Sequence, residues 1–436
     1  MSQMSRQKHL EGDFAPRSPL PSLSDPNRHL KTLTGLRAVA AAWVVLFHAS
    51  LLFAVLIPPL AKTLPLTGMG FLGVDLFFAL SGFVLCHRYL DSLGVAFNRH
   101  KVKDFLALRI ARLYPVHLFV IVIFVLYIGF VTQFGTSQRW DAKSPWPLLP
   151  QHLVLIHAWF NQQLSWNGPA WSVSLEWFAY LCFPFLALLL FRVARSKHFV
   201  IYSVLIFVVA YTPLTLDIIG VWHFPPNTFA SLPSNPGLIS LALVRLLGAF
   251  TGGCIAFVLA RAWQRRVGAD RSPSAVLCGT FCAALLLVVI VFTRSGESEI
   301  TQRTWIVSPL LVALVGLVGL GGSFFQWLTR PTLIKLGLSS YSLYMTHWFV
   351  FSVFGVLPGI DVGETLADRF EIAQQPLGAR VLFCLAALTT CYLVAQLCWR
   401  FIEEPSRRGL RRRFASSRGE LPVEERVDSS APIMES

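Results

Sequence analysis

The chain has 436 residues, of which 54% are hydrophobic, 13% are aromatic and only 14% are charged. A soluble globular protein carries about 25% charged residues, so a water-soluble domain of this size would have to bury far too much apolar surface. The composition also excludes disordered, collagen-like and disulfide-scaffold proteins. It predicts an all-α polytopic membrane protein.

Both ends of the chain differ in composition from the middle. Residues 1–32 are polar and rich in proline, and they contain no apolar signal-peptide core. We expect 1–32 to form a disordered cytoplasmic tail, and 406–436 to form a basic and then disordered cytoplasmic tail. The region 33–405 is expected to be one transmembrane domain.

Ten apolar stretches are long enough to cross a bilayer, which requires about 20 residues. In chain order they are 33–57, 69–90, 113–133, 169–192, 198–220, 237–261, 274–294, 304–328, 338–357 and 379–402. The segment 148–160 is too short to span and is expected to be a surface or re-entrant piece. The predicted fold is therefore a membrane helix bundle with about ten transmembrane helices.

The net charge is +14, and the basic residues that cause it are distributed unevenly between the segments that connect these stretches. If both termini are cytoplasmic, 28 Lys and Arg residues lie on the cytoplasmic side and six lie on the other side. This asymmetry predicts the orientation by the positive-inside rule. It describes a multi-pass protein of the cell membrane, inner or plasma, and explains the basic charge without a nucleic-acid partner.

The cysteines give no sign of a metal site. All eight lie in apolar stretches, and none has the CxxC or Cys/His spacing of a zinc site. We expect them to be packing residues, and we expect no metal.

Six ionisable residues within the predicted spans are the main functional candidates. A charge near the bilayer centre costs at least about 2.5–3.5 kcal/mol, so such residues usually serve function, although a structural ion pair would account for any one of them. The six are Arg37, His48, Asp75, Glu176, Arg245 and His347.

Arg37 and His48 are eleven residues apart, which places them on one face of a helix, about 16 Å apart along its axis. This geometry suits a site that anchors an anionic group near the cytoplasmic mouth and performs chemistry deeper in the membrane. Histidine can transfer protons near neutral pH, and a carboxylate from Asp75 or Glu176 could orient its ring. Arg245, at a similar depth, is the alternative partner for one of these carboxylates.

Arg109 and Arg112 form an RxxR pair within 102-VKDFLALRIARLYP-115. Residues three apart are neighbours on a helix, and two guanidinium groups together suit a phosphate. The alternative interpretation is positive-inside anchoring with phospholipid contact.

Six sequence blocks resemble, in order, the acyltransferase-3 family of integral-membrane O-acyltransferases. They are 34-TGLRAVAAAWVVLFH-48, 70-GFLGVDLFFALSGFVL-85, the RxxR block with Tyr114-Pro115, 171-WSVSLEWFAYLCFP-184, 337-GLSSYSLYMTHWFV-350 and 402-IEEPSRR-408. Each block is loose by itself, but six in family order on this hydropathy pattern are strongly specific.

The resemblance implies transfer of an acyl group, usually acetyl, from cytoplasmic acyl-CoA to a hydroxyl of an envelope or exported molecule. The family's RX10H pair maps onto Arg37 and His48, and its RxxR motif maps onto Arg109 and Arg112. The other positions of this chain that match family motifs are Asp75, Ser81, Trp171, Ser172, Glu176, Tyr341 and His347.

We therefore expect His48, Arg37, Asp75 and Glu176 to be catalytic. Binding of acyl-CoA, a co-substrate rather than a permanently bound cofactor, is expected from Arg109, Arg112 and Arg37, and the substrate path from Ser81, Trp171, Ser172, Tyr341 and His347. His48 would act as general base or carry the acyl group, and the sequence leaves both routes open.

The acceptor is expected to be a cell-envelope glycan, a glycolipid or an exported glycoside. Some family members carry an additional esterase-like domain after the last span. The sequence given ends about 30 residues after that span, so we expect the stand-alone form.

A proton-coupled transporter is the alternative function, because intramembrane His, Asp, Glu and Arg residues also form proton relays. Against it, the sequence contains no evident inverted repeat and no paired Gly/Pro-broken helices. A non-catalytic scaffold fits poorly with ionisable residues on several helices. The sequence has neither a GxSxG elbow nor a GxxxxGK[ST] loop, which argues against serine-hydrolase chemistry and nucleotide hydrolysis.

Overall fold

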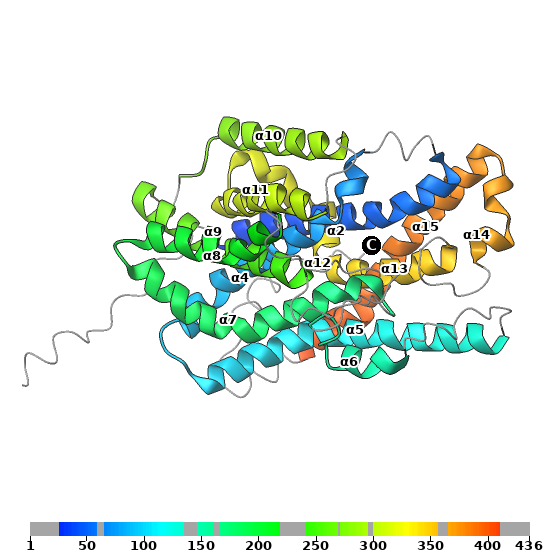
Figure 1. The fold of residues 1–436 in the computed structure, drawn as a ribbon, viewed down its shortest axis with the longest axis horizontal. Helices are drawn as coiled ribbons and strands as arrows, with labels where there is room; N and C mark the ends of the chain where they lie inside the picture. The colour runs from blue at the N-terminus through cyan, green and yellow to red at the C-terminus, as the bar shows by residue number, and fades with distance from the viewer. Residues whose placement is uncertain are drawn as a thin grey trace, which may run out of the picture.

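The computed structural model describes residues 26–58, 65–134, 146–159, 166–218, 241–268, 271–294, 300–355 and 365–409. In these ranges the regular structure is entirely helical (Figure 1). The longer helices are α2 (Pro26–Leu56), α4 (Leu72–Leu93), α5 (Arg99–Phe134), α7 (Trp171–Arg195), α8 (Phe199–Ile218), α9 (Leu241–Val267), α10 (Ala275–Arg294), α11 (Ile300–Leu320), α13 (Ser340–Phe354) and α15 (Leu377–Cys398).

Short helices connect these longer ones. They are η1 (Pro65–Met69), η2 (Trp146–Leu148), α6 (Leu149–Leu153), η3 (Gly168–Ala170), η4 (Ser323–Thr329), α12 (Pro331–Leu338), α14 (Leu366–Arg369), η5 (Ile372–Gln374) and the π-helical turn η6 (Trp399–Glu403). Several of them begin at or directly after a proline, which fits the first turn of a helix because its missing N–H would be unpaired there.

Within the described residues each of the ten predicted spans overlaps one of the longer helices, which confirms the all-α membrane bundle, although the predicted span 304–328 is divided between α11 and η4. Among the described residues, eight helices are long and apolar enough to cross a bilayer, or nine if α11 and η4, which meet at 89°, form one span. The predicted span 338–357 corresponds to α13, whose 15 residues rise about 22 Å. That is shorter than the hydrocarbon core of about 30 Å.

The helical region extends beyond the predicted boundaries at both ends. Residues 26–32, which we expected in the N-terminal tail, form the first turns of α2. Residues 406–409, expected in the C-terminal tail, continue the helix that follows η6. The remainder of both predicted tails, 1–25 and 410–436, lies outside the described residues.

Helices α4 and α9 form the most extensive helix–helix contact in the described part of the chain. Small residues let the two backbones touch: a Cβ on Gly253 would overlap the backbone of Ala79, and a Cβ on Gly82 would overlap the carbonyl of Phe250. Close approach at small residues is a common way for membrane helices to pack. As a result α9 is the most buried of the spanning helices that the structure describes.

Contacts at the two ends of α15 show its direction relative to α2 and α13. Glu403, just after α15, accepts a hydrogen bond of 2.6 Å from Ser342 in the first turn of α13. At the other end of the bundle, Arg380 in the first turn of α15 donates to the carbonyl of Leu56, the last residue of α2, at 3.2 Å. Thus α15 is antiparallel to α2 and α13, and the described chain begins and ends on one side of the bundle.

Candidate active site

Helices α2 and α13 run parallel and touch at two polar contacts. Arg37 Nη2 donates to Ser340 Oγ at 3.1 Å, and His48 Nδ1 lies 3.0 Å from His347 Nε2. The His48 ring also stands edge-on to Trp348, with centroids 4.9 Å apart. Arg37 and His48 therefore face the same neighbouring helix, as their spacing predicts, and the imidazole points into the protein.

Glycines explain why this end of α13 reaches Arg37. A Cβ on Gly35 would overlap the carbonyl oxygen of Leu328 in η4, and a Cβ on Gly337 would overlap the carbonyl oxygen of Thr34. Since glycine has no Cβ, η4 and α12 can lie directly on the first turns of α2. This approach places Ser340 within hydrogen-bond distance of Arg37.

A cavity of about 60 Å³ lies between α2, α4, α5, α7 and α13, with room for a few waters or a short acyl chain. Its polar wall consists of Arg37, Ser81, Arg112, Ser172, Glu176, Ser340, Tyr341 and Tyr344. Its apolar wall consists of Val74, Phe77, Phe78, Leu80, Val84, Leu85 and Val173. The structure thus brings together six of the predicted site residues around one space.

The cavity carries charges of both signs. Arg37 has Arg112, Glu176, Glu403 and Arg407 as electrostatic neighbours. The Glu176 carboxylate accepts hydrogen bonds from Ser81 Oγ, at 3.0 Å, and from Tyr180 Oη. These bonds hold Glu176 in the wall of the cavity, where it is an electrostatic neighbour of Arg37 and Arg112. The arrangement can bind an anionic group at the guanidinium groups while the carboxylate accepts a hydrogen bond from a neutral hydroxyl.

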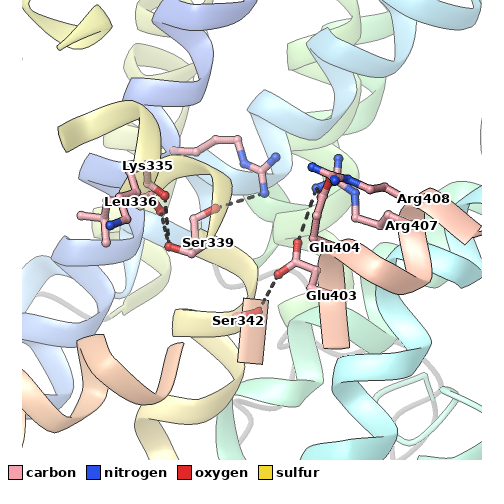
Figure 2. Close-up of polar contacts among 10 residues, drawn as sticks. Lys335, Leu336, Ser339, Ser342, Glu403, Glu404, Arg407 and Arg408 are labelled. Carbon is pink, nitrogen blue, oxygen red and sulfur yellow. Dashed lines mark hydrogen bonds and ion pairs between the residues drawn. The ribbon is translucent and has the colours of Figure 1, made fainter. Parts of the chain in front are cut away.

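Glu403 was not among the predicted site residues. It is only 2% exposed, and besides its bond to Ser342 it lies 3.8 Å from Arg407 Nη1. Figure 2 shows Glu403 turned toward Ser342, with Arg407 and Arg408 grouped beyond Glu404. The sequence feature that could have identified Glu403 is its position in 402-IEEPSRR-408, directly after the last apolar stretch.

The RxxR pair is divided between two environments. Arg112 lines the cavity, whereas Arg109 is 9% exposed and donates to Tyr89 Oη at 3.0 Å. The Arg109 guanidinium also lies 5.8 Å from the ring of Phe105 and 5.9 Å from the ring of Tyr180. We predicted that both arginines bind a phosphate, but the structure places Arg109 behind the wall, where it supports Tyr180.

Asp75 is fully buried against Arg245 rather than beside His48. Arg245 Nη2 lies 2.5 Å from Asp75 Oδ2 and Nε lies 3.3 Å from Oδ1, and Arg245 also donates to the carbonyl of Phe71 at 3.3 Å. This is the alternative in which Arg245 neutralises a carboxylate. The side chain that hydrogen bonds to His48 is His347, so an imidazole takes the orienting position that we had assigned to a carboxylate.

The remaining path candidates, Ser172 and Trp171 in α7 and Tyr341 in α13, each contact a neighbouring helix. Ser172 Oγ and Tyr344 Oη are 2.8 Å apart, and Tyr341 Oη donates to the carbonyl of Leu113 at 2.6 Å. Ser172 and Tyr341 line the cavity, as expected for a substrate path. Trp171 packs instead against Arg245, whose guanidinium lies 5.7 Å from its ring.

A second histidine cluster lies where α6 folds back against α5. The rings of His152 and His157 stack with centroids 3.7 Å apart, and His117 Nε2 lies 2.9 Å from the carbonyl oxygen of His152. Burial, together with the neighbouring histidines, lowers the pKa of His152 below its ordinary value and that of His157 to about 3. In the parts of the chain that the structure describes, no group of three or more ligating side chains is arranged to hold a metal ion.

The helix bundle, with a cavity between its helices, defines a polytopic membrane protein. A family model described as an acyltransferase domain matches residues 30–396. The chain belongs to this family, and it is a multi-pass membrane acyltransferase. The family that the six sequence blocks resemble is thereby confirmed.

Curated proteins give a consistent comparison. The chain is 26% identical to acyltransferase MdmB of Streptomyces mycarofaciens, over 88% of this chain and 93% of that protein. It is 25% identical to YrhL of Bacillus subtilis, which is proposed to be a peptidoglycan O-acetyltransferase, and 24% identical to O-acetyltransferase OatA of Staphylococcus aureus. Each match covers 87% of this chain but only 55% of YrhL and 58% of OatA. No solved structure matches the chain.

Proposed function

We propose that this protein is an acyl-CoA-dependent O-acyltransferase of the inner or plasma membrane. It transfers an acyl group, with acetyl favoured, to a hydroxyl of a cell-envelope glycan, a glycolipid or an exported glycoside. The supporting observation is the cavity, which extends from Arg37 and Arg112 to Tyr344. The ring of Tyr344 lies 5.9 Å from that of His347, the partner of His48. The relatives YrhL and OatA, whose names refer to O-acetyl transfer, support the same class of reaction.

The arginine end of the cavity is suited to the donor. Two guanidinium groups bind phosphate oxygens well because their N–H groups match the geometry of the anion. The CoA phosphates would bind at Arg112 and Arg37, and the thioester would extend toward His48. The apolar wall of the cavity, which includes Phe77 and Phe78, would contact the uncharged arm of the donor.

His48 and His347 do not line the cavity, but His347 lies next to Tyr344, which does, and the histidine pair is suited to the chemistry. Neutral His48 takes the proton from the acceptor hydroxyl as the hydroxyl oxygen attacks the thioester carbonyl carbon. A C–O bond forms, the C–S bond breaks, and CoA leaves as a thiol with the proton that His48 had taken. In the covalent alternative, the acyl group first passes to a nitrogen of His48 and then to the hydroxyl.

The two carboxylates have different parts in this proposal. Glu176 lines the cavity and accepts a hydrogen bond from the acceptor, whereas Asp75 acts through Arg245 by holding α4 against α9. Neither carboxylate is assigned to orient His48.

The test is mass spectrometry of envelope glycans and glycolipids from cells that carry the wild-type chain, His48→Ala or His100→Ala. His100 is an exposed histidine in the first turn of α5 and serves as the control. We expect one glycan or glycolipid to gain the mass of one acyl group with the wild type and the control, but not with His48→Ala. Equal masses in all samples, together with proton-driven flux into vesicles without acyl-CoA, would contradict the proposal and favour the transporter.

A further inference from the structure

A backbone carbonyl determines which nitrogens donate and which accept in the histidine pair between α2 and α13. His347 Nδ1 lies 3.1 Å from the carbonyl oxygen of Leu343, one turn earlier on α13. A carbonyl oxygen can only accept a hydrogen bond, so His347 Nδ1 carries a hydrogen. In a neutral imidazole the other nitrogen then holds a lone pair and can only accept. His347 Nε2 is therefore an acceptor.

The hydrogen-bond direction at His347 also determines that at His48. His48 Nδ1 lies 3.0 Å from His347 Nε2, and because that nitrogen accepts, His48 Nδ1 must donate. Neutral His48 then keeps its lone pair on Nε2. The contact survives proton uptake, since a protonated His48 still carries a hydrogen on Nδ1.

We infer that His347 is a positioning residue that fixes the tautomer of His48, so that Nε2 of His48 is the atom that accepts the proton of the acceptor hydroxyl. The inference rests on the proposed function and deepens it. His347 takes the part that a buried carboxylate has in a Ser-His-Asp triad, where the carboxylate holds the imidazole in one tautomer and orientation. The His347 side chain is fully buried, and Asp75 is already paired with Arg245.

The test compares His347→Leu with His347→Gln, and uses His198→Leu, at an exposed histidine, as the control. Each protein, in membranes, is given deuterated acetyl-CoA and isolated cell envelopes, and the rate of deuterated acetyl incorporation is measured. Loss of the correct tautomer lowers kcat about 10⁴-fold in the serine-protease triad. For His347→Leu we expect a loss of about 10²–10³-fold, because a positioning residue cannot contribute more than the general base that it positions, which is worth about 10²–10⁴-fold. The oxygen of Gln can accept the hydrogen of His48 Nδ1, so His347→Gln should retain a rate at least ten-fold higher than His347→Leu. The KM for acetyl-CoA should stay the same, because His347 does not line the cavity.

A second readout follows the tautomer itself. Solid-state NMR of ¹⁵N-histidine-labelled protein, with His48 assigned by comparison with His48→Ala, should show the ring hydrogen on Nδ1 in the wild type and on Nε2 in His347→Leu. A wild-type hydrogen on Nε2 would overturn the inference, as would a wild-type rate in His347→Leu or equally low rates in the Leu and Gln variants. If the wild type incorporates no acetyl group while its hydrogen lies on Nδ1, the proposed function fails and the assignment of the tautomer to His347 stands.

Discussion

Two groups of intramembrane charges differ in how completely they are paired. Asp75 and Arg245 form a two-pronged ion pair that is almost fully buried. Arg37 and Arg112 instead face a cavity. A charge in the membrane needs a partner. We infer that the first group stabilises the fold, whereas the second group, which has Glu176 and Glu403 as neighbours, also binds an anionic ligand.

The largest effect on turnover is expected at His48, next to the cavity that Arg37 and Arg112 line. His48→Ala should lower turnover by about 10²–10⁴-fold, the usual contribution of a general base, while the helices still insert and pack. Release of CoA thiol from acetyl-CoA measures turnover, and thermal unfolding in detergent measures packing. Turnover equal to that of the wild type would remove His48 from the mechanism.

Substitutions in the Asp75–Arg245 ion pair should affect stability rather than turnover. Asp75→Asn leaves Arg245 as an uncompensated buried charge, so unfolding should cost about 3–5 kcal/mol less than in the wild type. The double variant Asp75→Leu/Arg245→Met removes both charges and should recover most of that stability. Denaturant unfolding in detergent provides the measurement. If the single variant is as stable as the wild type, the pair is not structural.

The arginine end of the cavity should affect donor binding more than turnover. Arg112→Gln removes charge-assisted hydrogen bonds worth about 1.5–3 kcal/mol each, so we expect the KM for acetyl-CoA to rise at least ten-fold with a small change in kcat. Arg99→Gln, at an exposed arginine in the first turn of the same helix, is the matched control. An unchanged KM in Arg112→Gln would exclude this residue from the donor site.

The parts of the site that follow from helix geometry could be predicted from the sequence. The common face of Arg37 and His48 depends only on the helical repeat, and the spans depend only on apolar length. The choice of partner could not be predicted, because it depends on contacts across large sequence separations: His48 meets His347, and Arg109 meets Tyr89.

Glu403 shows a different limit of sequence reasoning. It ends a π-helical turn, which departs from the regular α-helical repeat. The face of the helix on which Glu403 lies therefore cannot be read from an α-helical pattern, although its hydrogen bond to Ser342 is plain in the structure.

The smallest effect is expected from the histidine cluster at α6, where buried groups are neutral rather than charged. The pKa of His157 is lowered to about 3 by burial and the neighbouring His117, against about 6.5 in an unfolded chain. The unfolded state therefore binds more protons between these values. The contribution of neutral His157 to the stability of the folded state is complete above about pH 6.5 and is lost as the pH falls toward 3.

At pH 6 this loss amounts to about 1 kcal/mol. The change in thermal midpoint between pH 7.5 and pH 6 should therefore be smaller in His157→Leu than in the wild type. An identical change in both proteins would show that His157 titrates normally in the folded state.

We propose that acyl transfer takes place between the guanidinium groups of α2 and α5 and the imidazole pair of α2 and α13. The most direct measurement is a cryo-electron microscopy structure of the protein in lipid nanodiscs with a non-hydrolysable thioether analogue of acetyl-CoA. Our account predicts phosphate density at Arg112 and the acyl carbonyl within reach of His48 Nε2. An analogue bound elsewhere, or a His48 ring turned toward lipid, would contradict it.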